Sequence, residues 1–189
     1  GRAGVGCDNV DVEAATKRGI IVMNVPSGNT ISAAEHTVTL MLALARRVPE
    51  ADATMRAGKW ERNKLVGTEL LGKTLGVVGL GKIGAEVAKR AQSFGMRVIA
   101  YDPFLSTERA RQLEVQCVPL KQVLKEADVI TLHLPLTAQT KHLIGAKELA
   151  LMKKSARLIN CARGGIIDEQ ALHKALTGGA LAGAALDVY

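Results

Sequence analysis

The chain has 189 residues, 48% of them hydrophobic and only 3% aromatic, with a formal net charge of +7. This length allows one domain with a sizeable core, and the aliphatic composition favours interleaved helices and parallel strands over an aromatic β-sandwich. The positive charge favours anionic ligands, but no recognition motif or aromatic stacking surface accompanies it, so we do not expect nucleic-acid binding.

The three cysteines, Cys7, Cys117 and Cys161, are widely spaced and form no metal-binding motif. Scattered cysteines in odd number are typical of a reducing compartment, so we expect a cytoplasmic protein without a metal site. We see no signal-peptide pattern and no apolar run long enough to cross a bilayer, so we expect no membrane association. Because the first residues read as the middle of a functional loop, we also expect the chain to be part of a longer protein.

The first element expected in chain order is a strand at 19–25, a short apolar run that ends at Pro26. Turn residues follow at 26–30. Ser32 and Glu35 then fit a capping box, in which the serine hydroxyl bonds the Glu35 amide and the glutamate bonds back. We therefore predict that a helix opens at Ser32.

The helix from Ser32 is apolar on most of its faces through Leu44. Such a helix is buried all round or lies in an interface. Pro49 perturbs it, and we expect a second helical stretch that continues to Gly58. The basic run at 56–64 also contains an acidic residue and is interpreted as a solvated turn.

Beyond residue 73, short strands alternate with helices, and the strands are apolar throughout. This pattern is typical of a parallel sheet covered by helices on both faces. We expect Asp168 to cap the last helix and Gly178 to follow its end. The predicted strands span 74–78, 97–102, 115–119, 128–135, 156–162 and 182–189. The predicted helices span 82–94, 106–113, 120–126, 146–152 and 169–176.

The segment between the first strand of this series and its helix contains Gly79, Gly81 and Gly84. A glycine pattern with a strand before it and a helix after it is the context of a dinucleotide-binding fingerprint. The first glycine permits a tight turn, the second lets the backbone approach a pyrophosphate, and the third lets the helix pack close to the sheet. The free N–H groups of the helix N-terminus would face the phosphates. We therefore predict a Rossmann doubly wound α/β fold.

Asp102 ends the next predicted strand, and Pro103 follows it. A carboxylate at this place can accept hydrogen bonds from the adenosine ribose and would repel a 2′-phosphate, which favours NAD over NADP. The alternative is that Asp102 only caps a turn before Pro103.

Several segments together resemble the D-isomer-specific 2-hydroxyacid dehydrogenase family: GRAGVGCDNVD, SAAEHT, GKWERNKLVGTELLGKTLGVVGLGKIG, YDP, LHLPLT and NCARGGIIDEQAL. Members of this family have two Rossmann-like domains with the active site in the cleft between them. The resemblance implies that residues 31–189 form the NAD-binding domain and that residues 1–30 are the tail of the substrate domain and the crossing segment. It also implies a homodimer or higher oligomer through the helix from Ser32.

The resemblance assigns roles to individual residues. Lys82 and Ile83 would touch the pyrophosphate through their amides, and Leu134 and Pro135 would flank the adenine side. Asp187 would face the nicotinamide amide. The remaining expected cofactor contacts, all around the nicotinamide, are Val5, Cys161, Ala162 and Arg163.

Arg163 is the residue to which the resemblance assigns catalytic chemistry. The arginine of the family grips the carboxylate of the 2-oxo acid and polarises its carbonyl oxygen, and a guanidinium suits this because it is forked and always charged. The alternative is a tight turn in which Arg163 makes a surface pair. Arg2 and Gly4 are candidate substrate contacts, and Arg2 could bind a phosphate. His133 is interpreted as a core histidine, and His36 could bond across an interface.

Within the family, the segments at 2–11 and 58–70 are most similar to members that oxidise D-3-phosphoglycerate to 3-phosphohydroxypyruvate in serine biosynthesis. This implies NAD as the cofactor and a small anionic 2-hydroxy or 2-oxo acid as the substrate. Reductases of glyoxylate or hydroxypyruvate share these motifs, and an NAD-sensing corepressor-like protein is the alternative of another class. The acid–base glutamate and histidine of the family would lie after Tyr189, so we expect little or no turnover from this chain alone.

Overall fold

The computed structural model describes residues 1–7 and 9–189. Its strands are β1 (Thr74–Val78), β2 (Arg97–Tyr101), β3 (Gln116–Cys117), β4 (Val129–Leu132), β5 (Arg157–Asn160) and β6 (Gly183–Leu186). Its helices are α1 (Val12–Lys17), α2 (Thr30–Arg46), α3 (Val48–Arg56), α4 (Lys82–Ser93), α5 (Thr107–Gln112), α6 (Leu120–Glu126), α7 (Ala146–Leu149) and α8 (Glu169–Thr177), with a 3-10 turn, η1 (Arg62–Lys64).

The six strands form one sheet in the order β3-β2-β1-β4-β5-β6, and every neighbouring pair is parallel. The strand order reverses direction between β1 and β4, which is where doubly wound sheets bind ligands at the carboxyl ends of their strands. The predicted Rossmann fold is therefore confirmed. Each predicted strand from residue 74 onward contains one observed strand, and most of the observed strands are shorter at one or both ends.

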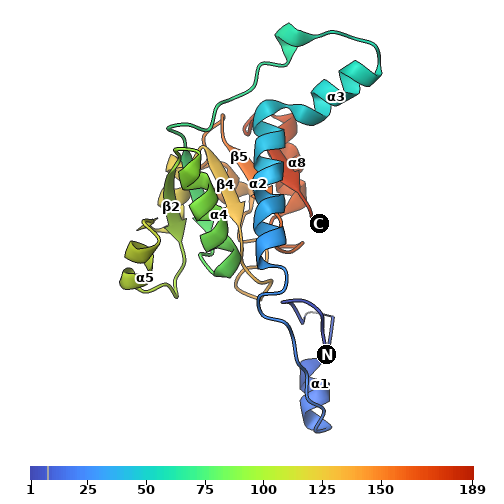
Figure 1. Cartoon of the computed structure of the whole chain (residues 1–189), viewed down its shortest axis with the longest axis vertical. Coiled ribbons are helices and arrows are strands. Elements are labelled where there is room, and N and C mark those ends of the chain that lie inside the picture. The colour runs from blue at the N-terminus through green and yellow to red at the C-terminus, as the bar shows by residue number, and fades with distance from the viewer. Residues whose placement is uncertain (8) are drawn as a thin grey trace.

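Helices cover both faces of this sheet, and aliphatic side chains fill the two layers between them (Figure 1). On one face, α2 and α4 pack against each other, α4 also contacts β1 and β2, and α2 contacts β5 and β6. Met41, Val87 and Leu75 belong to the buried cluster of this face. On the other face, α6 packs against β1 and β2, and α7 contacts α6 and α8. Val123, Leu149 and Leu172 of these helices share one buried cluster with residues of β4 and β5 such as Ile130 and Leu158. The core lies in these two layers, as the uniformly apolar strands predicted.

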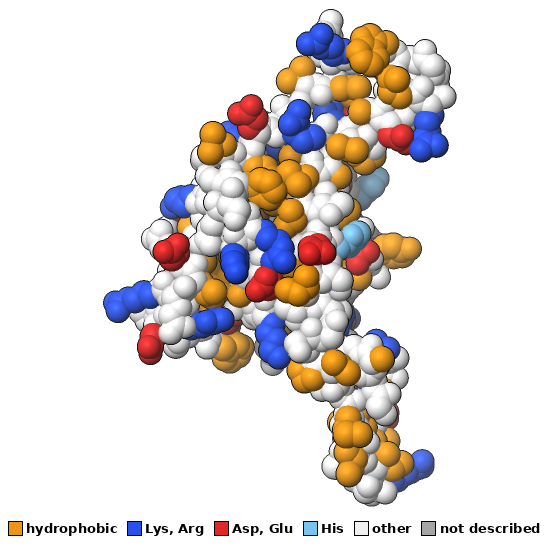
Figure 2. All heavy atoms as spheres, in the orientation of Figure 1, with side chains coloured by type: hydrophobic (Ala, Val, Ile, Leu, Met, Phe, Trp, Pro, Cys, Tyr) orange, Lys and Arg blue, Asp and Glu red, His pale blue; other side chains and the backbone are white. Residues whose placement is uncertain are grey.

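Two segments project from the layered body (Figure 1). One is the N-terminal segment with α1, which the sequence did not predict, and the other consists of α3 and η1. Figure 2 shows hydrophobic side chains at the outer ends of both projections. Large apolar residues exposed there include Ile21 at 80%, Met55 at 56% and Trp60 at 78%.

The strand predicted at 19–25 is wrong. Only an isolated bridge between Arg2 and Asn24 forms there among the described residues, and Arg2 donates its amide to the Met23 carbonyl at 2.8 Å. An apolar run becomes a strand only where neighbouring strands take its backbone hydrogen bonds, and the described residues offer this run a single partner.

The capping box at Ser32 is also wrong. The helix α2 begins two residues earlier, at Thr30, and Ser32 Oγ donates to the Asn29 carbonyl at 3.1 Å instead of capping. The helix is buried on one face only, since Glu35 and His36 are exposed. Arg47 in a left-handed conformation then separates α2 from α3, which carries Pro49 in its first turn as expected.

Two predicted helix ends are confirmed. Asp168 caps α8, since its Oδ1 accepts the Ala171 amide at 3.0 Å. Gly178 directly follows the last residue of α8 and is its C-cap. No helix in the described part of the chain is both long and apolar enough to cross a membrane.

Candidate functional site

The loop between β1 and α4 contains the three fingerprint glycines, and the structure requires two of them for packing. A Cβ at Gly79 would lie 2.7 Å from the His133 carbonyl oxygen, and φ at this glycine is +93°. A Cβ at Gly84 would collide with the Gly79 carbonyl oxygen. A Cβ at Gly81, in contrast, meets no described atom within 4 Å, although Gly81 is the N-cap of α4. The space over the N-terminus of α4 is therefore open.

A cavity of about 370 Å³ lies beside this loop, at the carboxyl ends of β4 and β5 and the N-termini of α2 and α4. It is the place that the topology predicts for a ligand. Most of the residues predicted around a dinucleotide share this cavity. The predicted residues that line it are Val5, Gly81, Lys82, Ile83, Leu134, Pro135, Cys161, Ala162 and Arg163. Other lining residues are Pro26, Asn29, Thr30, Ala33 and His133.

Asp102 lies beyond the cavity, directly after β2. Its Oδ2 accepts the Leu80 amide of the glycine loop at 2.8 Å, and its Oδ1 accepts the Phe104 amide at 2.9 Å. The second bond is the turn-capping contact named as the alternative, while the first ties the carboxylate to the fingerprint. The same side chain thus sits beside the glycine loop and caps the turn that follows.

The segment after β5 places Arg163 at the cavity. Arg163 Nη1 donates to the Ala162 carbonyl at 2.7 Å. Asn160, the last residue of β5, is 2% exposed. Its Nδ2 donates to the Arg163 carbonyl at 2.9 Å, and its Oδ1 accepts the Ala162 amide at 3.0 Å. In the sequence, Asn160 is only the first residue of the NCARGG motif. Nothing in the spacing of that motif predicted that its side chain would hold the backbone of residues 162 and 163.

The N-terminus of α2 also faces the cavity, which the sequence missed. Thr30 is 9% exposed, and its Oγ1 is buried without a hydrogen-bond partner among the described residues. Asn29, the N-cap, makes no side-chain capping bond within the described chain. A buried hydroxyl without a partner is costly unless a ligand or water satisfies it. The turn residues that precede α2 were the only sequence signal of this site.

Lys82 connects the two walls of the cavity. Its Nζ donates to the Pro26 carbonyl at 3.2 Å, which joins the first turn of α4 to the segment before α2. The N-terminal segment is further held by Asn24, whose Nδ2 donates to the Val5 carbonyl at 2.8 Å. Arg2 Nε donates to the Gly6 carbonyl at 3.0 Å, and Arg2 and Gly4 do not line the cavity.

His133 has a protein partner, as predicted, but it lies directly after β4 and is only partly buried, so it is not a core histidine. Its Nε2 lies 3.0 Å from Thr131 Oγ1. Burial lowers the pKa of His133 to about 4, so the imidazole is neutral at pH 7. The residue also lines the cavity, and its neutral ring can only offer hydrogen bonds there, not charge.

Asp187 does not line the cavity. It is exposed, and its Oδ1 lies 3.2 Å from His36 Nε2, so His36 finds its partner within the chain. The Asp187 amide donates to the Asn160 carbonyl at 2.9 Å, which keeps this residue beside the Arg163 segment.

Burial raises the pKa of the Cys161 thiol, a hydrogen bond with Thr37 opposes this, and the Asp187 charge adds to it. Cys161 is thus a neutral cavity wall rather than an activated nucleophile.

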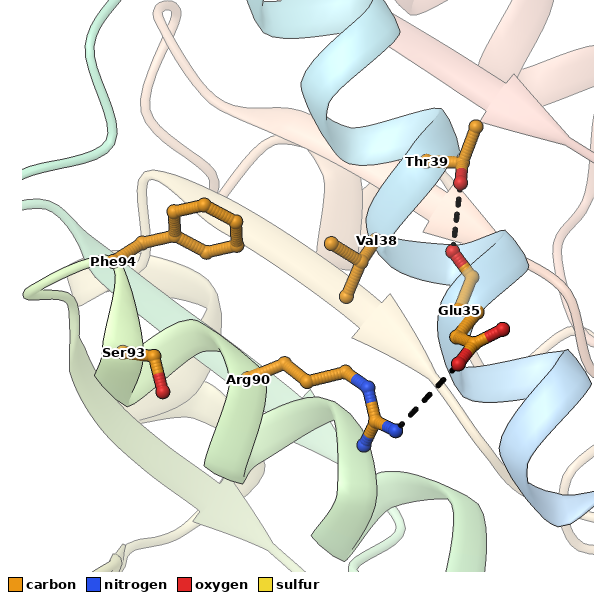
Figure 3. Close-up of a pocket in the computed structure, with 6 residues that line it drawn as sticks. All are labelled: Glu35, Val38, Thr39, Arg90, Ser93 and Phe94. Atoms are coloured by element: carbon orange, nitrogen blue, oxygen red, sulfur yellow. Dashed lines mark hydrogen bonds and ion pairs between the residues drawn. The ribbon is translucent and has the colours of Figure 1, made fainter.

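A second hollow of about 460 Å³ lies between α2 and α4 on the outer surface (Figure 3). Arg90 spans it from α4 and lies 4.0 Å from Glu35 of α2, while Val38 and Phe94 supply apolar walls. Arg90 also pairs with Glu86 on its own helix. The hollow contains no fingerprint residue, and its charges neutralise one another, so it is not the candidate site. Among the described residues, no cluster of three or more metal-binding side chains is present.

Comparison with known proteins gives a family match. The model of the D-isomer specific 2-hydroxyacid dehydrogenase NAD binding domain matches residues 38–189. The whole chain is 55% identical over 190 residues to D-3-phosphoglycerate dehydrogenase of Methanocaldococcus jannaschii and 56% identical over 189 residues to that of Homo sapiens. The chain covers 36% of the length of each of these relatives.

Solved structures agree with the fold. The TT0316 protein from Thermus thermophilus superposes with a TM-score of 0.91 at 46% identity, over 98% of this chain and 58% of that one. D-lactate dehydrogenase from Aquifex aeolicus, complexed with NAD and lactic acid, superposes with a TM-score of 0.90 at 36% identity, over 98% of this chain and 56% of that one. The resemblance of the sequence to the family is thereby confirmed.

Proposed function

Because this chain belongs to the D-isomer specific 2-hydroxyacid dehydrogenase family, we propose that it is the NAD-binding part of a D-3-phosphoglycerate dehydrogenase, which oxidises D-3-phosphoglycerate to 3-phosphohydroxypyruvate. The observation that carries the proposal is the cavity that joins the glycine loop to Arg163. The similarity to D-3-phosphoglycerate dehydrogenases over the full chain supports this substrate within the family.

Two features of the cavity fit a dinucleotide. The open space at Gly81 is not needed for the packing of this chain, and it admits a pyrophosphate over the N-terminus of α4. Thr30 lines the same cavity, and its buried Oγ1 has no hydrogen-bond partner among the described residues. We assign Lys82 and Ile83 to the pyrophosphate through their amides.

The adenosine end of the dinucleotide is assigned to Asp102. Its carboxylate already holds the Leu80 amide beside the glycine loop and would accept the ribose hydroxyls from that position. A second negative charge, as in the 2′-phosphate of NADP, would be repelled there. Leu134 and Pro135 form the neighbouring wall and flank the adenine.

The nicotinamide end is assigned to Val5, Cys161, Ala162 and Arg163, with Asp187 adjoining them. NAD supplies the hydride acceptor when it is bound. Arg163 would hold the substrate carboxylate with its forked guanidinium and polarise the oxygen on C2, which lowers the barrier to hydride transfer. Arg2 and Gly4 would approach the phosphate end of the substrate from the N-terminal segment.

The proposal extends to the organisation of the whole protein. Residues 31–189 form the cofactor domain, and residues 1–30 are the tail of the substrate domain and the crossing segment. The exposed apolar surface of α2 and α3 would be covered in a homodimer, as the exposed Met55 and Ile31 suggest. The three cysteines are free, which fits a cytoplasmic protein.

The test is a calorimetric titration of this chain with NADH and with NADPH, followed by the same titrations of Asp102→Ala. We expect tight NADH binding, at least about tenfold weaker NADPH binding, and a loss of about tenfold in NADH affinity for the variant. A folded chain that binds neither nucleotide contradicts the cofactor assignment. Unchanged NADH affinity in Asp102→Ala removes the role of Asp102 but leaves the remaining assignments.

The substrate is tested by comparing turnover of phosphohydroxypyruvate, glyoxylate and hydroxypyruvate by the full-length protein. Phosphohydroxypyruvate is expected to have the highest kcat/KM. Preference for glyoxylate or hydroxypyruvate would assign the protein to another branch of the family. NADH binding without turnover of any 2-oxo acid would indicate an NAD-sensing protein.

A further inference from the structure

Asn160 is a buried polar residue at the carboxyl end of β5, and its side-chain amide bonds to the segment that follows. Its Nδ2 donates to the Arg163 carbonyl at 2.9 Å, and its Oδ1 accepts the Ala162 amide at 3.0 Å. With 2% of its surface exposed, water does not compete for these groups. The two bonds close the backbone of residues 161–163 into a loop on the end of the strand.

Only a side chain with one donor and one acceptor in the same plane can make both bonds. An aspartate at position 160 would keep the bond from the Ala162 amide but would set a second oxygen against the Arg163 carbonyl. An alanine would remove both hydrogen bonds from the partly buried Ala162 N–H and Arg163 C=O, which is costly. Asparagine therefore matches this loop in a way that residues of similar size do not.

The loop held by Asn160 is also fixed from its other side. The Asn160 carbonyl accepts the Asp187 amide at 2.9 Å, and a Cβ at Gly164 would collide with the Tyr189 carbonyl oxygen. Residues 161–164 thus lie between the end of β5 and the segment after β6. Arg163 enters the cavity from a backbone whose position is set by hydrogen bonds and not by its own side chain alone.

We propose that Asn160 is a positioning residue of the dehydrogenase reaction, which sets the Arg163 guanidinium at the angle needed to grip the substrate carboxylate. This inference rests on the proposed function, because it takes Arg163 as the group that holds the 2-oxo acid. The chemistry requires such fixation, since a displacement of about 1 Å in a substrate-holding group can lower the rate by about 100-fold. Asn160 itself does not line the cavity.

The test is a double-mutant cycle on the full-length protein, with kcat and KM measured for phosphohydroxypyruvate and NADH. Asn160→Asp is expected to lower kcat/KM for the 2-oxo acid by about 10-fold to 100-fold. In an Arg163→Gln background the same change is expected to cost less than about twofold, because the group that it positions is gone. Equal losses in both backgrounds would assign Asn160 a structural role only and overturn the proposal.

A matched control separates the positioning of Arg163 from a general loss of protein stability. Asp128 is a partly buried polar residue whose carboxylate accepts the Thr74 amide at 2.8 Å and the Lys153 ammonium at 2.8 Å. It precedes β4, at the amino-terminal edge of the sheet and away from the cavity. Asp128→Asn is expected to lower the unfolding temperature while kcat/KM stays within about twofold of the parent.

A measurement without turnover keeps the proposal distinct from the proposed function. The Nε–H resonance of Arg163 in this chain is expected to shift or broaden in Asn160→Asp and to stay in place in Asp128→Asn. An unshifted resonance in Asn160→Asp overturns the positioning role, whatever the enzyme turns over. A shifted resonance in a full-length protein that reduces no 2-oxo acid would instead refute the proposed function and leave the anchoring of Arg163 standing.

Discussion

The layered body and the N-terminal segment are both rich in aliphatic residues, yet they fold differently. In the body, Leu75, Val77 and Val78 of β1 are fully buried between β2 and β4. In the N-terminal segment, Ile20 and Ile21 are 57% and 80% exposed, and their run forms no strand in the described structure. An apolar segment therefore forms a strand only where neighbouring strands pair with it and a helix layer covers it.

The comparison also separates two kinds of glycine within the body. The packing of α4 on the glycine loop leaves no room for a side chain at Gly84, whereas Gly81 borders open space at the cavity. The first belongs to the interior of the fold, and we propose that the second serves dinucleotide binding. A substitution at Gly84 should therefore lower stability, whereas a substitution at Gly81 should weaken NADH binding.

The largest effect is expected at Gly84. Gly84→Ala places a methyl group against the Gly79 carbonyl, so the loop or the helix must shift. We expect a loss of about 3 kcal/mol in the free energy of unfolding, measured by urea denaturation. The matched control is Gly81→Ala, which should change this free energy by less than about 1 kcal/mol and weaken NADH binding by about tenfold. A stable Gly84→Ala would show that the loop is looser than its contacts imply.

The next effect is the pH dependence that His133 brings to the body. Its pKa falls from 6.5 to about 4 on folding, so between these values the unfolded chain binds a proton that the folded chain does not. Stability should therefore fall as pH drops from 7 to 4, by up to about 3 kcal/mol from this residue.

His133→Gln should reduce that slope in thermal unfolding measured at several pH values. His173→Gln, at an exposed position of α8, should leave it unchanged. Equal slopes in the parent and in His133→Gln would mean that the imidazole is accessible to protons in the folded state.

The smallest effect is expected in the N-terminal segment. Ile21→Ser replaces an isoleucine that is 80% exposed, and we expect the free energy of unfolding to change by less than about 0.5 kcal/mol. Ile99→Ala, in β2 and fully buried, should cost about 3 kcal/mol in the same urea titration. Comparable losses at the two positions would mean that Ile21 is covered in solution by a further part of the protein or by a second copy.

The sequence by itself determined the order of elements from β1 to β6, because most strands there are short apolar runs bounded by turn residues; the exposed β3 is the exception. It also determined the fingerprint, since the spacing of Gly79, Gly81 and Gly84 is a local property of a strand, a turn and a helix. The resemblance to the family then supplied residues such as Arg163, which no local pattern could have assigned.

Only the tertiary structure decided which residues meet around the cavity. Thr30 and Asn160 lie far apart in the chain, and each shows its importance only through a missing or a satisfied hydrogen bond in the folded protein. The start of α2 at Thr30, the single bridge at Asn24 and the pairing of His36 with Asp187 were likewise settled by the fold of the described residues. Local patterns fix the conformation that a segment prefers, whereas burial and polar satisfaction depend on what the rest of the chain brings to it.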